Sequence, residues 1–377
     1  MTTRARASTA TEPWLAVAIV ALVAVRIFVA ALLVAAPLDR DPWLARAETI
    51  ASSPATPYRH FPVSMMPGET VAILLVGEVP LAGTVAIVAF VADLAAAAAV
   101  ARGWGRRAAA VYLALGLPML AVAYVQLDLV AVALAAWAAA SFRQRQDAPF
   151  AVLLGLAFWW KLWPLVLAPA AWVGRRRAAL IPAAVVLGVG GVAWFLWGGR
   201  DGPLQVLTSR GAVGWSVDGT VGSVVRLVTA EPAIAEAGAL RVGAIPLWAR
   251  AGLFVALAAT QLAIWRDAER DRDREPFGAT AVAAIAALLA LAPVSPTLAA
   301  VWVLPFAAVA MGSDREERRV AVLATGAIVL SGMLALRAPD QQSTILTLVA
   351  LARNLLWIAA VASWLTRPIP RRLAPGA

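Results

Sequence analysis

The chain has 377 residues, of which 62% are hydrophobic and only 14% are charged. A soluble domain is about half apolar and about a quarter charged, so much of this protein's surface must face lipid. Its apolar stretches run for about 16 to 25 residues without the strict alternation of a barrel strand, and a backbone in lipid must satisfy its own hydrogen bonds. The composition therefore predicts an all-α, polytopic integral membrane protein in the plasma membrane.

The net charge of +10 comes from arginines gathered between the apolar stretches. Cytoplasmic loops of membrane proteins carry such an excess, whereas a nucleic-acid platform would need a basic helix interleaved with aromatic residues. We therefore expect membrane lipids around the protein, no nucleic-acid partner, and both termini in the cytoplasm. The clusters are Arg102 to Arg107, Arg143 to Arg145, Arg175 to Arg177, Arg266 to Arg274, Arg315 to Arg319 and Arg367 to Arg372.

In chain order, the apolar run at about 14–36 is too long for the core of a signal peptide and is predicted to be a retained first span. It leads to a predicted external loop at about 37–67. The stretch 69–101 returns inward with a break near Glu78–Pro80. Two further spans, 108–125 and 129–142, are joined by a tight external turn at 126–128.

Residues 150–173 do not fit a simple span, because one crossing would place Arg175–Arg177 outside. A re-entrant pair of short helices, bent between Lys161 and Pro164, keeps these arginines inside. The span 178–198 then leads to a second external segment at about 199–249. Five more spans are predicted near 250–265, 277–293, 297–312, 320–336 and 343–366. The whole chain, 1–377, is thus one transmembrane domain of about 10–12 spanning or re-entrant helices.

Lys161 is the sole lysine of the chain and stands inside the apolar run Phe158-Trp-Trp-Lys-Leu-Trp-Pro164. A charge within the membrane is costly and suggests a functional site. Its compact ammonium suits the phosphate of a lipid carrier. The structural alternative is that the side chain reaches the interface beside its aromatic neighbours.

The first external loop contains several candidate general bases. They are Asp39, Asp41, the sole histidine His60, and Glu69. The alternative is a solvated loop in which these acids pair with Arg40, Arg46 and Arg59.

Polar residues mark two other places on the predicted external face. Gln126 and Asp128 form a polar notch between apolar spans, or a turn with a helix-capping aspartate. The segment 209–220 carries Arg210, which could hold a phosphate, Trp215, which could stack on a sugar, and Asp218.

Three charged residues lie inside apolar stretches, and structural pairing is the expected role of Arg26, Asp93 and Arg353. No residues have the spacing of a transition-metal site. We therefore expect no cofactor. Binding of a loosely held divalent cation is the alternative that the sequence leaves open.

In this order, these pieces resemble the polyprenol-phosphate-sugar-dependent glycosyltransferases of the GT-C fold, and most closely glycosyltransferase family 87, the actinobacterial mannosyltransferase-like group. The resemblance rests on an acid after span one followed by Pro57-Tyr-Arg-His-Phe, and on Gln126-Leu-Asp128 followed by Gly155 and Lys161-Leu-Trp-Pro164. It continues through Arg210 to Ser223, and ends with Ser295-Pro296 and Trp302-Val-Leu-Pro305.

The resemblance implies an inverting hexosyltransferase that moves a sugar such as mannose from a polyprenyl-phosphate donor to a glycan or glycolipid acceptor in the cell envelope, on the extracytoplasmic face. It implies a first-loop base, for which we choose Asp41, with Asp39 second and His60 as the alternative. The implied donor and phosphate contacts are Lys161, Arg210, Arg59, Gln126 and Asp128. The implied acceptor or sugar contacts are Tyr58, Trp215 and Asp218.

Two other classes of function stay open. Members of the family commonly carry an aspartate where His60 stands, so the chain could also be a non-catalytic, divergent paralogue. A lipid or glycolipid flippase or a secondary transporter would also be polytopic with buried charges. Such proteins favour repeated halves and short loops, whereas this chain shows two long external segments and no convincing repeat.

Overall fold

The computed structural model describes residues 13–35, 50, 65–76, 81–207, 212–229, 231–236, 239–271, 274–293, 297–336 and 343–367. Within these ranges, seven helical segments are long and apolar enough to cross a membrane. They are α1 (Pro13–Ala35), α5 (Leu81–Trp104), the segment from α6 (Arg106–Leu115) to α7 (Leu120–Ala123), α11 (Leu180–Gly198), α14 (Leu247–Arg270), α17 (Arg315–Ala335) and α18 (Thr344–Leu365). The protein is therefore a multi-pass, α-helical membrane protein, as its composition predicts.

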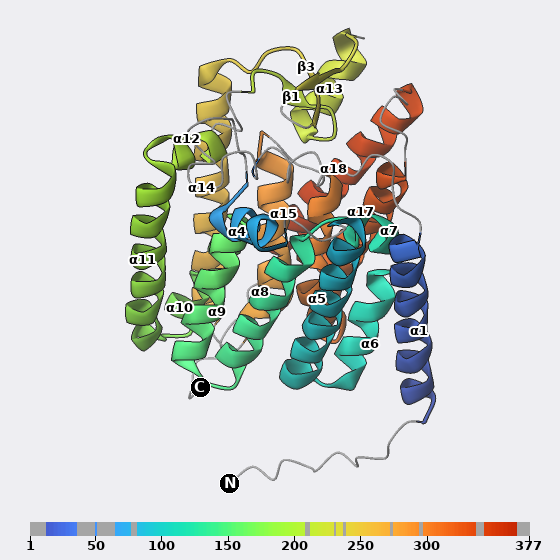
Figure 1. Ribbon diagram of the computed structural model, residues 1–377, viewed down its shortest axis with the longest axis vertical. Helices are drawn as coiled ribbons and strands as arrows, with labels where there is room; N and C mark the ends of the chain where they lie inside the picture. Colours follow the sequence, from blue (N-terminus) through green and yellow to red (C-terminus); the bar gives the residue numbers. More distant parts are fainter. Residues whose placement is uncertain are drawn as a thin grey trace, which may run out of the picture.

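Shorter elements lie between these helices. The α-helices are α4 (Pro67–Val76), α8 (Asp128–Arg143), α9 (Asp147–Trp160), α10 (Ala170–Val173), α12 (Asp201–Leu207), α13 (Thr220–Thr229), α15 (Ala281–Leu291) and α16 (Leu304–Met311). The 3₁₀ segments are η1 (Leu117–Met119), η2 (Trp163–Leu167), η3 (Arg177–Ala179) and η6 (Thr297–Val303), and η5 (Pro276–Thr280) is a π-helical turn. Among them, α4 lies across the bundle rather than along it (Figure 1).

One end of the bundle gathers the basic loops, and we call it the arginine-rich end (the lower end in Figure 1). Polar contacts join helix ends there: Arg102 to Gln144 at 3.1 Å, Arg143 to Glu275 at 2.7 Å, Arg176 to Asp147 at 2.8 Å, and Arg367 to Asp267 at 2.7 Å. The start of α1 and the end of α18 both lie at this end (Figure 1). That this end faces the cytoplasm stays a prediction from the positive-inside rule.

The helices around Lys161 turn back on themselves. Helix α9 starts at the arginine-rich end, and α10 returns there, since the ion pair of 2.8 Å joins Asp147 at the start of α9 to Arg176 beyond α10. The chain turns where Lys161 adopts an extended conformation (φ −147°, ψ 145°) and Pro164 follows in η2. The depth of this hairpin in a bilayer stays a prediction.

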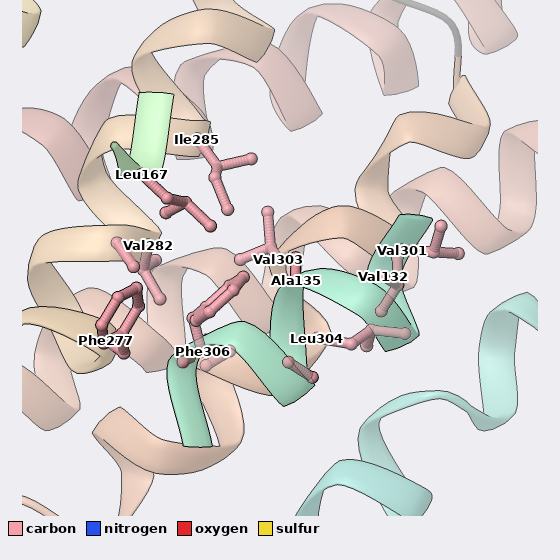
Figure 2. Close-up of a cluster of buried hydrophobic side chains, with 14 of the residues drawn as sticks. Val132, Ala135, Leu167, Phe277, Val282, Ile285, Val301, Val303, Leu304 and Phe306 are labelled. Atoms are coloured by element: carbon pink, nitrogen blue, oxygen red, sulfur yellow. The ribbon is translucent and has the colours of Figure 1, made fainter. Parts of the chain in front are cut away.

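The core of the bundle is built by its shorter helices. Figure 2 shows side chains from α8, η2, η5, α15, η6 and α16 meeting in one cluster, with the rings of Phe277 and Phe306 side by side at one edge of it. Many of the neighbouring core residues are alanines, which lets helix backbones approach closely. By contrast, only Trp194 and Gly198 are buried on α11. The long helices α11 and α14 thus present most of their surface outward, as lipid-facing spans do.

Charges inside the spans are paired, as the sequence predicts. Arg26 on α1 and Asp93 on α5 are both buried and form an ion pair of 2.7 Å. The Tyr112 hydroxyl donates to the same carboxylate at 2.5 Å, and the Tyr124 hydroxyl donates to it at 2.8 Å. This buried network ties α1, α5, α6 and the residue after α7 together.

The end opposite the arginine-rich end carries a small sheet that the all-α prediction missed (Figure 1). Strands β1 (Trp215–Ser216), β3 (Ala239–Val242) and β2 (Ile234–Glu236) pair antiparallel in that order, and α13 packs on them. Strands of two to four residues are too short to show the period-2 alternation that reveals strands in sequence. The predicted external segment 199–249 is therefore partly folded as α12, α13 and this sheet.

The predicted span at 108–125 is interrupted rather than continuous. Its α-helix α6 ends at Leu115, and the chain passes through Gly116 and the 3₁₀ turn η1, which contains Pro118. Proline has no N–H to donate and disfavours the preceding α-helical turn. The turn is also packed tightly, since a Cβ atom on Gly332 of α17 would lie 2.4 Å from the Pro118 carbonyl oxygen.

The orientation can be tested with two single cysteines on exposed positions at opposite ends of the bundle. Thr229, at the end of α13, and Ala178, in η3, are both exposed. We expect Thr229→Cys to react with a membrane-impermeant maleimide in intact cells, and Ala178→Cys to react only after lysis. Gly174, which directly follows α10, is not suitable for the second cysteine, because a Cβ atom there would lie 2.3 Å from the Phe142 ring. The reverse labelling pattern would place the sheet in the cytoplasm.

Candidate functional site

The candidate site centres on Lys161, where the chain turns between α9 and η2. Helix α9 ends at Trp160, and η2 begins at Trp163 with Pro164 at its start. Proline suits a first helical turn but not the interior of a helix, so the sequence itself sets the break beside the lysine. The Lys161 side chain is 24% exposed, which leaves it partly accessible although it stands in an apolar hairpin.

Two buried carboxylates hold the Lys161 ammonium. The Nζ atom lies 2.8 Å from Oε1 of Glu69 and 3.3 Å from Oδ2 of Asp128. The Glu69 and Asp128 side chains are only 2% and 7% exposed. We call Glu69, Asp128 and Lys161 the carboxylate–lysine cluster. The cluster joins the start of α4, the start of α8 and the end of α9 at the Lys161 ammonium.

Glu69 reaches the cluster because α4 packs closely on the end of α9. A Cβ atom on Gly68 would lie 2.9 Å from the Trp159 carbonyl oxygen and 3.1 Å from Cα of Trp160. A side chain at position 68 would push the helices apart, since the closest contact is with backbone. Glycine here therefore permits the approach that brings Glu69 to Lys161.

Asp128 is positioned by tryptophans. Its Oδ1 atom accepts a hydrogen bond of 2.8 Å from Nε1 of Trp302, while Oδ2 faces Lys161. The Trp302 ring stacks on Trp163, with centroids 5.5 Å apart and planes 11° apart. Trp160 donates to the carbonyl oxygen of Leu127 at 2.9 Å. Aromatic groups thus fix the carboxylate's direction and cover one side of it with apolar surface.

A second polar group joins the segment 212–229, which carries Asp218, to the bundle. The Asp218 carboxylate accepts from the Thr297 hydroxyl at 2.7 Å, and its backbone carbonyl accepts from the side chains of Arg353 and Asn354. Arg353 and Asn354 are buried in the middle of α18. Arg353 therefore holds the Asp218 backbone inside the protein, which agrees with the structural role expected of it.

The segment before Asp218 is held by the sheet. The Glu236 carboxylate accepts from the backbone N–H groups of Val213 and Gly214 at 2.9 and 3.1 Å, which lowers its pKa. Arg241 is buried, which lowers its pKa, and it donates to the Gly214 carbonyl at 3.0 Å. These bonds fix the start of the loop that carries Asp218.

Segment η6 links both polar groups, because Thr297 contacts Asp218 and Trp302 contacts Asp128. Five residues of a 3₁₀ helix rise about 10 Å, so the two groups are neighbours along one rigid element. Seven residues is long for such a helix. The aspartates of two distant segments are thus placed relative to each other by one helix.

Of the residues singled out from the sequence, the structure brings Lys161 and Asp128 together. Gln126 is half-buried in the turn just before α8, and Asp218 lies at the other end of η6. Trp215 is buried in the hydrophobic core of the sheet. Six of the predicted residues lie outside the described residues: Asp39, Asp41, Tyr58, Arg59, His60 and Arg210.

Sequence reasoning missed the pairing of Glu69. It counted this residue among the loop's possible bases, but the partner of Lys161 was not foreseen. The available signal was weak: an acid in the first turn of a short apolar helix, directly after Pro67 and Gly68. Trp302 stood in a stretch that the resemblance marked, yet nothing in the sequence connected its indole to Asp128.

Among the residues that the structure describes, no three His, Cys, Asp or Glu side chains are grouped so that they could hold a metal ion. The described groups of the site are one cation and two carboxylates. Such a cluster can bind an anion through the ammonium and exchange a proton through the carboxylates.

Comparison with known proteins gives no family. No model of a known protein family matches the chain. No curated protein matches it either.

Proposed function

We propose that this protein is a membrane glycosyltransferase of the GT-C type, which moves a sugar from a polyprenyl-phosphate donor to an extracytoplasmic glycan or glycolipid acceptor. The observation that carries the proposal is the partly exposed Lys161 ammonium, held inside an apolar hairpin by Glu69 and Asp128. A cation fixed in a lipid-facing protein suits a substrate that brings a phosphate on a lipid chain. The order of motifs that resembles glycosyltransferase family 87 supports the same reading.

The proposed reaction is a single displacement. The acceptor hydroxyl oxygen forms a bond to the anomeric carbon, and the bond between that carbon and the phosphate oxygen breaks. The bonding pair leaves with the lipid phosphate, while the hydroxyl proton passes to a carboxylate. Lys161 would stabilise the negative charge that develops on the leaving phosphate, which is where most of the acceleration is expected.

The proton acceptor stays a prediction from the sequence. Asp41 is the proposed base, with Asp39 second and His60 as the alternative. Asp218 is a further candidate, since its carboxylate accepts from Thr297 at the end of η6. A base of this kind contributes roughly 10²–10⁴-fold to the rate.

The test is transfer by purified protein in lipid nanodiscs. A panel of polyprenyl-phosphate sugars is supplied with an envelope glycolipid extract, and release of lipid phosphate and the appearance of a glycosylated product are followed by mass spectrometry. We expect one donor to yield both in equal amounts. Donor movement between leaflets of a vesicle, with no lipid phosphate released from any donor, would instead identify a flippase.

A further inference from the structure

The turn that carries Asp128 into the site lies between two parts of the hydrophobic core. Helix α7 ends at Ala123 and α8 begins at Asp128, so only residues 124–127 connect them. Tyr124 belongs to the main core of the bundle, whereas Leu127 belongs to a separate cluster that includes residues of α4 and α9. The place of Asp128 is therefore set by how this turn is held at its two ends.

Local backbone structure holds this turn only weakly. Helix α7 has four residues, and so short a helix is not stable by itself. Helix α8 begins behind Leu127, whose apolar side chain cannot cap the helix. The N–H of Gln126 donates to the Ala123 carbonyl oxygen at 3.4 Å, which is long for such a bond. The turn therefore depends on anchors provided by side chains.

One anchor is the Tyr124 side chain. Tyr124 is fully buried, and its hydroxyl donates to Oδ2 of Asp93 at 2.8 Å. The same oxygen accepts from Nε of Arg26 at 2.7 Å, and Arg26 also donates to the Leu113 carbonyl oxygen at 2.8 Å. The Phe90 ring packs edge-on against the Tyr124 ring, with centroids 6.2 Å apart. A carboxylate fixed between α1, α5 and α6 thus holds the start of the turn.

The opposite end of the turn is held by the site itself. The Asp128 carboxylate accepts from Trp302 at 2.8 Å and lies 3.3 Å from the Lys161 ammonium. The ammonium would also have to contact the proposed phosphate. Tyr124 and Asp93 stay out of a substrate's reach, because both are buried inside the bundle. Their bond can therefore keep Asp128 in place while the ammonium binds its ligand.

We propose that Tyr124 is a positioning residue, which acts on Lys161 through Asp128. Its hydroxyl ties the turn to the buried ion pair of Arg26 and Asp93. The turn thus holds the Asp128 carboxylate against the Lys161 ammonium. The effect of Tyr124 on turnover rests on the proposed function, whereas its effect on the position of Lys161 does not.

The chain offers a direct readout of this effect, because Lys161 is its only lysine. The full-length protein is produced with isotope-labelled lysine and a lysine-free tag, and placed in nanodiscs with an unlabelled scaffold, so that NMR detects one lysine side chain. We expect Tyr124→Phe, which removes only the hydroxyl, to shift or broaden the Lys161 Cε and Nζ signals. The turn then loses its bond to Asp93, and the Asp128 carboxylate moves relative to the ammonium.

Tyr112→Phe is the matched control. The Tyr112 hydroxyl donates to Oδ1 of the same Asp93 carboxylate at 2.5 Å, but Tyr112 stands within α6 and not in the turn. Each variant removes one hydroxyl from the buried network, so we expect similar losses of thermal stability. Only Tyr124→Phe should change the Lys161 signals. Its turnover with the identified donor should fall by about tenfold, because a small misplacement of a catalytic group lowers the rate, whereas Tyr112→Phe should stay near the wild-type value.

A double-variant cycle tests whether the effect passes through Asp128. Asp128→Asn removes the charge that faces Lys161, while its amide oxygen can still accept from Trp302. Adding Tyr124→Phe to Asp128→Asn should then change the Lys161 signals and the turnover no further. Phe90→Leu removes the ring packed against Tyr124 and should act in the same direction, which keeps the test decisive if Tyr124→Phe does not fold.

The outcomes separate this inference from the proposed function. Unchanged Lys161 signals in Tyr124→Phe and Phe90→Leu, equal changes in Tyr112→Phe, or additive effects in the cycle would each overturn the positioning role. The NMR measurements need no substrate and do not depend on sugar transfer. If the wild type releases lipid phosphate from no donor while the Lys161 signals respond as expected, the proposed function fails and the positioning role of Tyr124 stands.

Discussion

Lys161→Met is expected to abolish sugar transfer, with donor affinity and turnover both falling by about 10²-fold or more. The substitution keeps the length of the side chain but removes the only cation of the carboxylate–lysine cluster. The leaving phosphate then lacks its proposed counter-charge. Lys161→Arg keeps a charge in a wider, planar group, so its defect should be smaller. Turnover and binding are measured in nanodiscs with the donor that the transfer assay identifies.

Lost stability could imitate this result, because Lys161→Met removes the cation that lies between two buried carboxylates. Removing one partner of a buried ion pair destabilises by about 3–5 kcal/mol. The double variant Lys161→Met with Glu69→Gln removes part of that excess charge, so its thermal unfolding temperature should recover towards the wild-type value. Its turnover should not recover. Full activity in the folded double variant would show that Lys161 contributes stability alone.

Asp41→Asn should lower turnover by roughly 10²–10⁴-fold, because the side chain keeps its size and polarity but can no longer accept a proton. Donor binding should survive, since the proposed phosphate contact lies at Lys161 rather than at this residue. A fall in turnover with unchanged affinity is the signature of a group that acts in the transition state. Single-turnover rates with the identified donor measure it directly.

Neighbouring residues provide the controls for this assignment. Asp39→Asn should have the smaller effect if Asp41 is the base. Near-normal turnover in both aspartate variants, together with loss of turnover in His60→Ala, would move the role to the histidine. If all three variants stay active, the first loop does not supply the base, and Asp218 becomes the residue to replace.

The sequence by itself determined the class of the fold and most of its helices. Long runs of Ala, Leu and Val can satisfy their backbone in lipid only as helices, so α1, α11, α14, α17 and α18 begin and end within five residues of their predicted bounds. The break after Lys161 was also readable, because Pro164 stands there. Local chemistry decides these features, because each depends on residues that are adjacent in the chain.

The sequence predicted that buried charges have partners, but it did not identify the partners of Lys161. An ionised group in an apolar stretch must find a partner, and Arg26 and Asp93 do pair. The same rule predicted a partner for Lys161 but could not say which residue it is. Glu69 and Asp128 lie far from it in sequence. Only the packing of α4 on the end of α9, which Gly68 permits, and the position of the start of α8 bring them to the ammonium.

Tertiary structure alone decided the rest of the candidate site. The link between Asp128 and Asp218 passes through η6, and nothing in the sequence 297–303 signals a 3₁₀ helix with a polar group at each end. The small sheet stayed hidden because its strands are too short to show a pattern. The chain thus encodes its helices by local hydrophobicity, whereas the contacts between distant side chains, and with them the charge of the site, follow from how those helices pack.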